Sequence, residues 1–574
     1  MFRNIVICTA LLGLSAGLAA CSIIPLNTSV NIKLDDQPPG KFENAQIISG
    51  GMVASGDVPW WVPLDCRLKY RQTEVAIDAA KKSTNPKSKG PRAEEFWSEY
   101  CGAVDLDRDF IGLTLSGGGA RAAVFAAAVM FELEAAEILR KVDVISSVSG
   151  GSMTAALYGL SCDSVDDCPA TVEGSPRCLW RQDGKTGAAA SQGREDLCQG
   201  GVFEQLAKKL ETKFFLNLFR PDRVIRYWFT HYDRSDIMAD IMSDDLYDNS
   251  TLGGESFRFQ DLNPQRPSLI INATNFTKFR GPAHKDPDDG SWRSAVERLN
   301  FQFTGRVFKS DLCSDLDRYP LANAVMASAA FPGLFHYVTL TKFCKAEFDE
   351  GQTYKHLFDG GNSDNLGLLP FERMFDKEIR EREANRSGRR TLQSPKHRLP
   401  ENIVLLEVNA SLGLPGKSPN DPDPRSVLDY VIDSNFIDTT DSLMVLGYSQ
   451  IEDDIKGFLT KLECENGKGR FADGSRGECA EASQFVTIAL TNLKRTAIPA
   501  GDILWRCVKE IGTRFQIERG QIKQLRLAAK ILVQEKLYEI CTNDQGQRKD
   551  WIGKCPLSVT RGEYKTRAEE LCPG

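Results

Sequence analysis

Residues 142–153, VDVISSVSGGSM, hold a serine in a setting that suits nucleophilic catalysis. Ser149 stands where an apolar strand would turn into a helix, as the nucleophile of many serine hydrolases does. The usual elbow has glycine two residues before the serine, whereas this chain has Ser147 there and Gly151 two residues after. Both positions need small side chains because the turn is strained and tightly packed. We therefore predict Ser149 as the nucleophile; the alternative is a polar turn without a chemical role.

Three consecutive glycines in LSGGGARAA, residues 115–123, form a second candidate site. Glycines between a strand and a helix let backbone N–H groups point into a cleft at the positive end of the helix. A dinucleotide could use this loop, since Gly117–Ala122 fits G-x-G-x-x-G/A. Such a site needs an acid at the end of the second strand, but Asp143 lies at its beginning. An oxyanion hole for acyl transfer is the better interpretation.

Strand-like and helix-like segments alternate around both motifs. FIGLTLS at 110–116 and VDVISSV at 142–148 are apolar strands, and a glycine-rich helix start follows each. This order predicts a parallel sheet with crossover helices. Ser149 comes 32 residues after Gly117, which is one such step, so the carboxyl ends of adjacent strands should bring them together. Further strands are expected at 268–276, 401–410 and 484–493, and helices within 203–247 and 502–540.

A serine nucleophile also needs a base. The order Ser149, Asp359, His397 would supply an acid and a histidine, but His397 lies in SPKHRLP, a polar loop flanked by prolines. Asp359 itself ends an apolar strand in LFDGGNSDNLG and is followed by two glycines. Close backbone approach there would aim the carboxylate into a cleft. We predict that Asp359 is the base; an ordinary Asp-Gly turn is the alternative.

Three short blocks, in chain order, resemble the signature motifs of the patatin-like phospholipase family. They are Gly117–Arg121 (GGGAR), Ser149 within SVSGG, and Asp359–Gly361 (DGG). AVMASAAFPGLF at 324–335 is similar to a further block, and the similarity covers roughly residues 108–410, with insertions. The sequence departs from the family pattern at Ser147, where glycine is usual.

The resemblance implies a three-layer α/β sandwich with a mainly parallel central sheet. It also implies a Ser-Asp dyad that works without histidine, metal or another cofactor. Gly118 and Gly119 would donate hydrogen bonds to the oxyanion, and Gly117 would shape the loop. Arg121 would contact a lipid phosphate or, alternatively, hold the loop through an ion pair. The implied activity is hydrolysis of phospholipid or lysophospholipid acyl esters, and the alternative is a catalytically silent lipid-binding or scaffold lipoprotein of the envelope.

The N-terminus, MFRNIVICTALLGLSAGLAACS, has the pattern of an export signal. Arg3 precedes an apolar stretch that is short for a membrane span, and LAAC at 18–21 resembles the lipobox of bacterial lipoproteins. We expect residues 1–20 to be removed and Cys21 to be lipidated; a plain cleaved signal peptide is the alternative. The residue after Cys21 is Ser22 and not the aspartate that is associated with retention in the inner membrane. This pattern favours the outer membrane, facing the periplasm.

Cysteine number and charge limit the other function classes. Two of the 16 cysteines lie in the signal region, and the remaining 14 are an even number, as disulfides in an oxidising compartment require. Closeness in the sequence suggests the pairs Cys162–Cys168, Cys178–Cys198, Cys313–Cys344, Cys464–Cys479 and Cys555–Cys572. A net charge of −7 gives no general attraction to nucleic acid. Five histidines without a CxxC or HExxH motif speak against zinc.

The domain organisation follows from these segments. We expect an N-terminal extension at 21–105, a hydrolase domain at 106–500 with a disulfide-rich insertion at about 161–260, and a helical extension at 501–574. Residues 213–234, KFFLNLFRPDRVIRYWFTHYDR, mix aromatic side chains with arginines. They would form either a lid or lipid-facing surface, or a helix that packs its aromatics inward, and we expect the second. The oligomeric state is left open.

Overall fold

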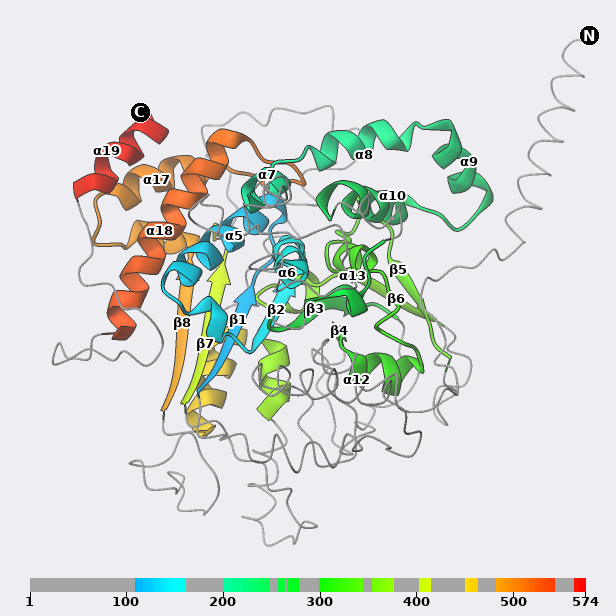
Figure 1. The fold of residues 1–574 in the computed structure, drawn as a ribbon, viewed down its shortest axis with the longest axis horizontal. Coiled ribbons are helices and arrows are strands. Elements are labelled where there is room, and N and C mark those ends of the chain that lie inside the picture. The colour runs from blue at the N-terminus through cyan, green and yellow to red at the C-terminus, as the bar shows by residue number, and fades with distance from the viewer. Residues whose placement is uncertain are drawn as a thin grey trace, which may run out of the picture.

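A central sheet of eight strands organises the fold of the computed structural model (Figure 1). The structure describes residues 109–161, 201–247, 256–263, 266–277, 299–343, 354–375, 402–413, 450–462, 482–541 and 562–573. The strand order is β5-β6-β3-β2-β1-β7-β8, and β4 pairs with β3. The parallel strands are β1 (Phe110–Leu115), β2 (Val144–Val148), β3 (Ser268–Asn275), β7 (Asn402–Asn409) and β8 (Ala482–Ala489). The antiparallel strands are β4 (Asn300–Phe303), β5 (Val338–Thr341) and β6 (Tyr354–Asp359).

The strands of the parallel part are apolar along their length because both faces of the sheet are covered. Every residue of β1 is buried, and its side chains alternate between two hydrophobic clusters. Ile111, Leu113 and Leu115 face α5 (Gly119–Ala135) and α6 (Gly150–Leu160). Phe110 faces the opposite cluster, which includes Phe371 and the helical residues 450–462. The predicted three-layer α/β architecture with a mainly parallel sheet is therefore confirmed.

Four helices follow α6 and lie near the ends toward which β1 and β2 point (Figure 1). They are α7 (Val202–Leu206), α8 (Leu210–Leu218), α9 (Pro221–Phe229) and α10 (Arg234–Ile241). The expectation that this segment packs its aromatics inward is wrong for three of them, Phe219, Trp228 and Phe229. Phe214 is buried, but Phe219 is 77% exposed and Trp228 is 62% exposed. The cysteines of the predicted disulfide-rich insertion lie outside the described residues.

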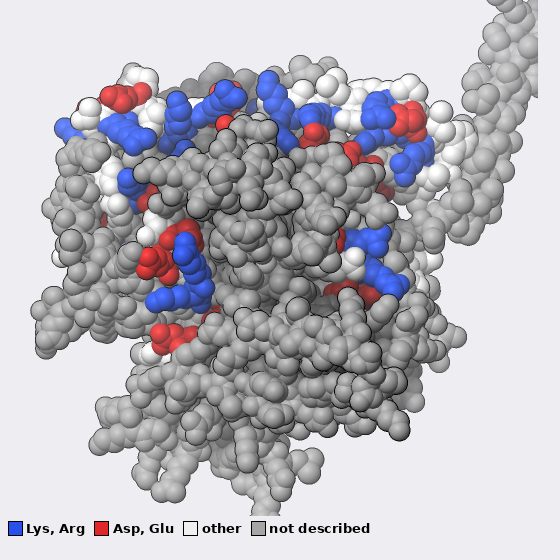
Figure 2. Space-filling view, in the orientation of Figure 1, with Lys and Arg blue, Asp and Glu red and all other residues white. Residues whose placement is uncertain are grey.

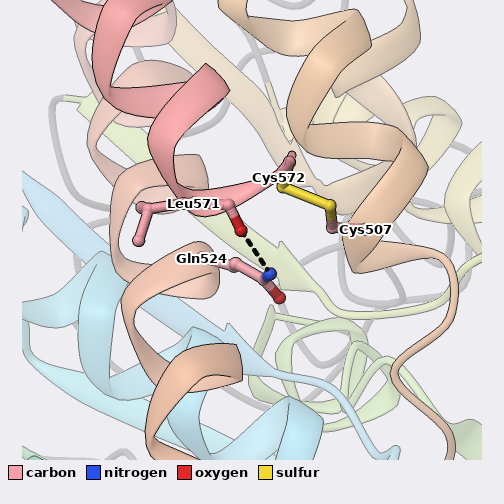
Figure 3. Close-up of a disulfide and its surroundings, with 4 residues drawn as sticks. All are labelled: Cys507, Gln524, Leu571 and Cys572. Carbon is pink, nitrogen blue, oxygen red and sulfur yellow. Dashed lines mark hydrogen bonds between the residues drawn. A yellow bond between two sulfur atoms is a disulfide. The ribbon is translucent and has the colours of Figure 1, made fainter. Parts of the chain in front are cut away.

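The C-terminal helices cover one edge of the sandwich. They are α17 (Ala500–Val508), α18 (Arg519–Cys541) and α19 (Gly562–Leu571), and α18 packs along α5. A disulfide between Cys507 and Cys572 joins α17 to the end of α19, beside a hydrogen bond from Gln524 to the Leu571 carbonyl (Figure 3). The predicted pair Cys555–Cys572 is therefore wrong, because the folding of these helices back on each other places Cys507 beside Cys572.

Each of the other predicted cysteine pairs includes at least one residue outside the described ones. Cys313 is disulfide-bonded, but its predicted partner, Cys344, is one of those residues. Among the helices that the structure describes, none combines the length and apolar character that a bilayer span requires.

Candidate active site

Ser149 occupies a strained turn between β2 and α6. Its backbone angles are φ 49° and ψ −117°, a combination that residues other than glycine rarely adopt. Such strain is found at the nucleophile elbow of hydrolases, where it lifts the serine out of the strand direction. Ser147, at the position where glycine is usual, is fully buried and its hydroxyl donates to the Ile270 carbonyl. The serine thus replaces the glycine without leaving a polar atom unpaired.

The glycine loop and the Ser149 turn meet backbone to backbone. β1 and β2 pair in parallel with Leu115 opposite Ser147, so both strands end at the same edge of the sheet. A Cβ atom added to Gly150 would lie 2.0 Å from the carbonyl oxygen of Gly119. Within the loop, φ is 130° at Gly118 and 60° at Gly119, values that favour glycine. The predicted meeting of the two motifs is therefore present in the structure.

Asp359 lies at the end of β6 and contacts Ser149 directly. The Ser149 hydroxyl donates to Asp359 Oδ2 at 3.1 Å, and both residues are 6% exposed. The other carboxylate oxygen, Oδ1, accepts a hydrogen bond from the Gly361 N–H at 2.8 Å. Thr274 Oγ1 donates to the Asp359 carbonyl at 2.7 Å and anchors the backbone of this residue on β3. These bonds orient the carboxylate toward the serine.

The three glycines of the loop differ in what their N–H groups can do. The Gly117 N–H donates to the Asn365 carbonyl at 3.0 Å, which ties the loop to the segment after Asp359. This N–H is therefore engaged within the protein. Gly118 and Gly119 stand at the N-terminus of α5, where the first N–H groups have no partner within the helix. They are the two candidates for oxyanion donors.

Arg121 is buried behind the glycine loop. Its Nε donates to the Ala410 carbonyl at 3.1 Å, and its Nη1 donates to the Ile511 carbonyl at 2.8 Å. The side chain is 7% exposed. These two bonds, both to backbone carbonyls, tie the start of α5 to distant segments, which is the kind of role that the loop-holding alternative describes. The Ala120 N–H donates to the Arg514 carbonyl, so the segment after α17 closes over the start of α5.

Two residues of this site were not singled out from the sequence. Ser328, near the end of α13 (Leu321–Ser328), accepts a hydrogen bond from the Ser149 N–H at 2.8 Å and donates to the Asn272 carbonyl at 2.6 Å. Asn272 Nδ2 in turn donates to Ser146 Oγ and to the Ser147 carbonyl. Only the resemblance of residues 324–335 to a family block pointed to this helix.

The dyad contact leaves no histidine between serine and acid. His397 lies outside the described residues. His356, on β6, shares a hydrogen bond with Thr339 Oγ1 at 3.1 Å, and burial lowers its pKa. The described residues hold no cluster of three or more side chains that could bind a metal ion.

The comparison with known families is decisive for the domain. Residues 113–372 match the family described as Patatin-like phospholipase. These residues form a patatin-like phospholipase domain. The matched range contains the glycine loop, Ser149 and Asp359. No curated protein matches the chain.

Solved structures with some likeness are remote. Human GIVD cytosolic phospholipase A2 is 13% identical with a TM-score of 0.36; the alignment covers 82% of this chain and 62% of that one. VipD from Legionella pneumophila is 12% identical with a TM-score of 0.24, covering 80% and 74%. The type III effector ExoU of Pseudomonas aeruginosa is 16% identical with a TM-score of 0.19, covering 59% and 53%. The chain thus spans less than two thirds of the first and third of these proteins.

Proposed function

We propose that this patatin-like protein is a serine acyl-ester hydrolase acting on phospholipids or lysophospholipids through a dyad of Ser149 and Asp359. The observation that carries the proposal is the direct hydrogen bond, 3.1 Å long, from the Ser149 hydroxyl to Asp359 Oδ2. It joins a serine on a strained turn to a carboxylate that other hydrogen bonds orient. Beside the glycine loop, this is the arrangement that nucleophilic acyl transfer requires.

The reaction runs in two halves. Asp359 accepts the hydroxyl proton as Ser149 attacks the acyl carbonyl, and the N–H groups of Gly118 and Gly119 stabilise the negative oxygen of the tetrahedral intermediate. The intermediate collapses to an acyl-serine, and the leaving alcohol takes the proton from Asp359. Water then attacks the acyl-serine with Asp359 as base, which releases the fatty acid and restores the serine.

Labelling with a fluorophosphonate probe tests the proposal on the folded protein. We expect the wild type to be labelled and Ser149→Ala and Asp359→Asn to lose the label. Ser161→Ala is the matched control, since Ser161 follows the same helix, α6, and its hydroxyl only donates to the Tyr158 carbonyl. Labelling that survives in Ser149→Ala would refute the site. Absence of labelling in folded wild type would favour the catalytically silent envelope lipoprotein.

The proposed place of action is the outer membrane, facing the periplasm, with the chain anchored through a lipid on Cys21. The lipobox-like sequence LAAC supports this, and residues 1–108 lie outside the described part of the chain. Growth with radiolabelled palmitate should label the wild type but not Cys21→Ser, and density-gradient fractionation should place the labelled protein in the outer membrane. Recovery of unlabelled wild type in the soluble periplasmic fraction would refute the anchor.

A further inference from the structure

Five large apolar side chains of α8, α9 and their junction face solvent. They are Leu216 (68% exposed), Phe219 (77%), Ile225 (59%), Trp228 (62%) and Phe229 (41%). We call these residues the α8–α9 face. Single exposed apolar residues are ordinary on protein surfaces, but several within fourteen residues mark a surface that meets another apolar phase.

The polarity of these helices is the reverse of what inward packing produces. In α9 the apolar residues Ile225 and Trp228 face outward, whereas Arg223 is the buried residue. Arg223 Nη1 donates to the Ile237 carbonyl at 3.3 Å, and its Nη2 lies 3.9 Å from Asp240. Burying a guanidinium while leaving a tryptophan in water is unfavourable unless the outer face has its own partner.

Basic side chains border the apolar ones. Residues 208–231 contain six Lys and Arg, of which all but the buried Arg223 reach the surface, against two Asp and Glu, although the whole chain has a net charge of −7. Lys209, Arg220 and Arg226 are exposed. In Figure 2, Lys and Arg gather along the upper edge of the molecule, where Figure 1 places α8 and α9. Apolar and aromatic side chains ringed by cations are typical of helices that lie in the interface of an anionic bilayer.

The inner side of α8 leads to the candidate active site. The Phe214 ring contacts the Phe335 ring, with centroids 5.4 Å apart, and Phe335 contacts Phe515 at 5.3 Å. Phe515 follows Arg514, whose carbonyl accepts the hydrogen bond from the Ala120 N–H beside the glycine loop. A membrane that contacts the α8–α9 face would therefore lie near the edge of the sheet that carries Ser149, at the carboxyl ends of β1 and β2 (Figure 1).

We propose that the α8–α9 face docks the protein on the surface of an anionic phospholipid bilayer. Its apolar residues would enter the boundary between head groups and acyl chains, and the basic residues would contact the phosphates. This inference rests on the proposed function, because it identifies the aggregated lipid surface as the form in which the substrate reaches Ser149.

Vesicle flotation measures docking separately from catalysis. Binding is measured on the full chain carrying Ser149→Ala, to prevent hydrolysis, and Cys21→Ser, to remove the predicted acylation site. The probes are vesicles of phosphatidylcholine alone and of phosphatidylcholine with phosphatidylglycerol. We expect preferential binding to the anionic vesicles and a loss of at least about tenfold in Phe219→Ser/Trp228→Ser. Lys209→Gln and Arg220→Gln should each cost about fivefold, and the loss should shrink at high salt.

Tyr354→Ser/Tyr538→Ser is the matched control, since these tyrosines are 42% and 40% exposed on other elements. It should bind as the parent does. In the active background, hydrolysis of dispersed p-nitrophenyl butyrate should change less than about twofold in Phe219→Ser/Trp228→Ser, because both side chains face solvent whereas Ser149 is buried.

The two proposals fail in different ways. Unchanged vesicle binding in Phe219→Ser/Trp228→Ser, or no binding by the parent, would overturn the docking face whatever the ester assay shows. Self-association lost in that variant, without vesicle binding, would assign the face to a second copy and likewise overturn it. Vesicle binding that depends on the face, without any ester hydrolysis in the active background, would refute the proposed function and leave the docking face in place.

Discussion

The Ser328 hydroxyl accepts a hydrogen bond from the backbone N–H of Ser149 at 2.8 Å and donates one to the Asn272 carbonyl at 2.6 Å. One side chain thus connects the strained elbow to β3 from the far end of α13. It satisfies an N–H group that the positive φ of Ser149 turns away from the regular strand pattern. Ser328 is a positioning residue: it acts on the nucleophile through the backbone.

Ser328→Ala should therefore impair catalysis without preventing folding. It removes a hydrogen-bond partner from the buried Ser149 N–H and from the buried Asn272 carbonyl, at a cost of about 1 to 3 kcal/mol, part of which falls on the geometry of the elbow. We expect kcat for a soluble ester to fall about tenfold with little change in KM. Ser161→Ala is the control, since Ser161 is equally buried and its hydroxyl donates to the Tyr158 carbonyl, away from the elbow. Equal losses in both variants would reduce Ser328 to a general contribution to stability.

The contact between Gly150 and Gly119 makes a second prediction. A methyl group on Gly150 would meet backbone atoms of the glycine loop, which cannot move aside as a flexible side chain could. We expect Gly150→Ala to separate the loop from Ser149 and to lower the rate of fluorophosphonate labelling at least about a hundredfold, since oxyanion donors work only at short range. Gly457→Ala is the control because no atom lies within 4 Å of its added Cβ. Normal labelling of Gly150→Ala would contradict the packing described here.

Substitution of Arg121 distinguishes a structural role for this residue from a role in binding the substrate. Its guanidinium holds the Ala410 and Ile511 carbonyls, so Arg121→Gln should loosen the glycine loop for every substrate. We expect kcat/KM to fall by similar factors for a phospholipid and for p-nitrophenyl butyrate, with a loss of about 2 to 4 kcal/mol in stability. The exposed Arg519→Gln should change neither. A loss confined to the phosphate-bearing substrate would restore the predicted phosphate contact.

Glu407 on β7 makes stability depend on pH. Burial, with a smaller contribution from Glu452, raises its pKa from 4.5 to about 8, and Thr487 and Asn409 donate to its two oxygens. The folded protein therefore keeps a proton that the unfolded chain loses above pH 4.5. Unfolding releases this proton, so the contribution of Glu407 to stability falls as the pH rises from about 4.5 to about 8.

Glu407→Gln removes this penalty and keeps both hydrogen-bond partners, because a glutamine oxygen can accept from Asn409 and its amide can donate to the Thr487 hydroxyl. The variant should exceed the wild type by about 4 to 5 kcal/mol at pH 9 and match it near pH 4.5. Thermal unfolding at both pH values measures the difference. A gain that is the same at both pH values would contradict a buried, protonated Glu407.

The sequence by itself determined the parts whose signals are local. Apolar strands, glycine-rich turns and helix-forming runs follow one another from Phe110 to Leu160, and this order requires a parallel sheet with its loops at one edge. That geometry brings Gly117–Gly119 to Ser149, and the acid at the end of an apolar strand, Asp359, completes the site. The positions where these segments meet hold small residues because nothing larger fits there, and such residues can be recognised in the sequence.

Only the tertiary structure decided which distant segments support that site. Ser328 reaches Ser149 across 179 residues and Arg121 reaches Ile511 across 390. An ordinary serine in a helix and an arginine bonded to a backbone carbonyl carry no pattern of spacing that would announce such contacts. The same holds for Cys507 beside Cys572. It also holds for α9, where the alternation of aromatics and arginines fits either polarity. Which side of that helix meets water depends on what the rest of the chain packs against it.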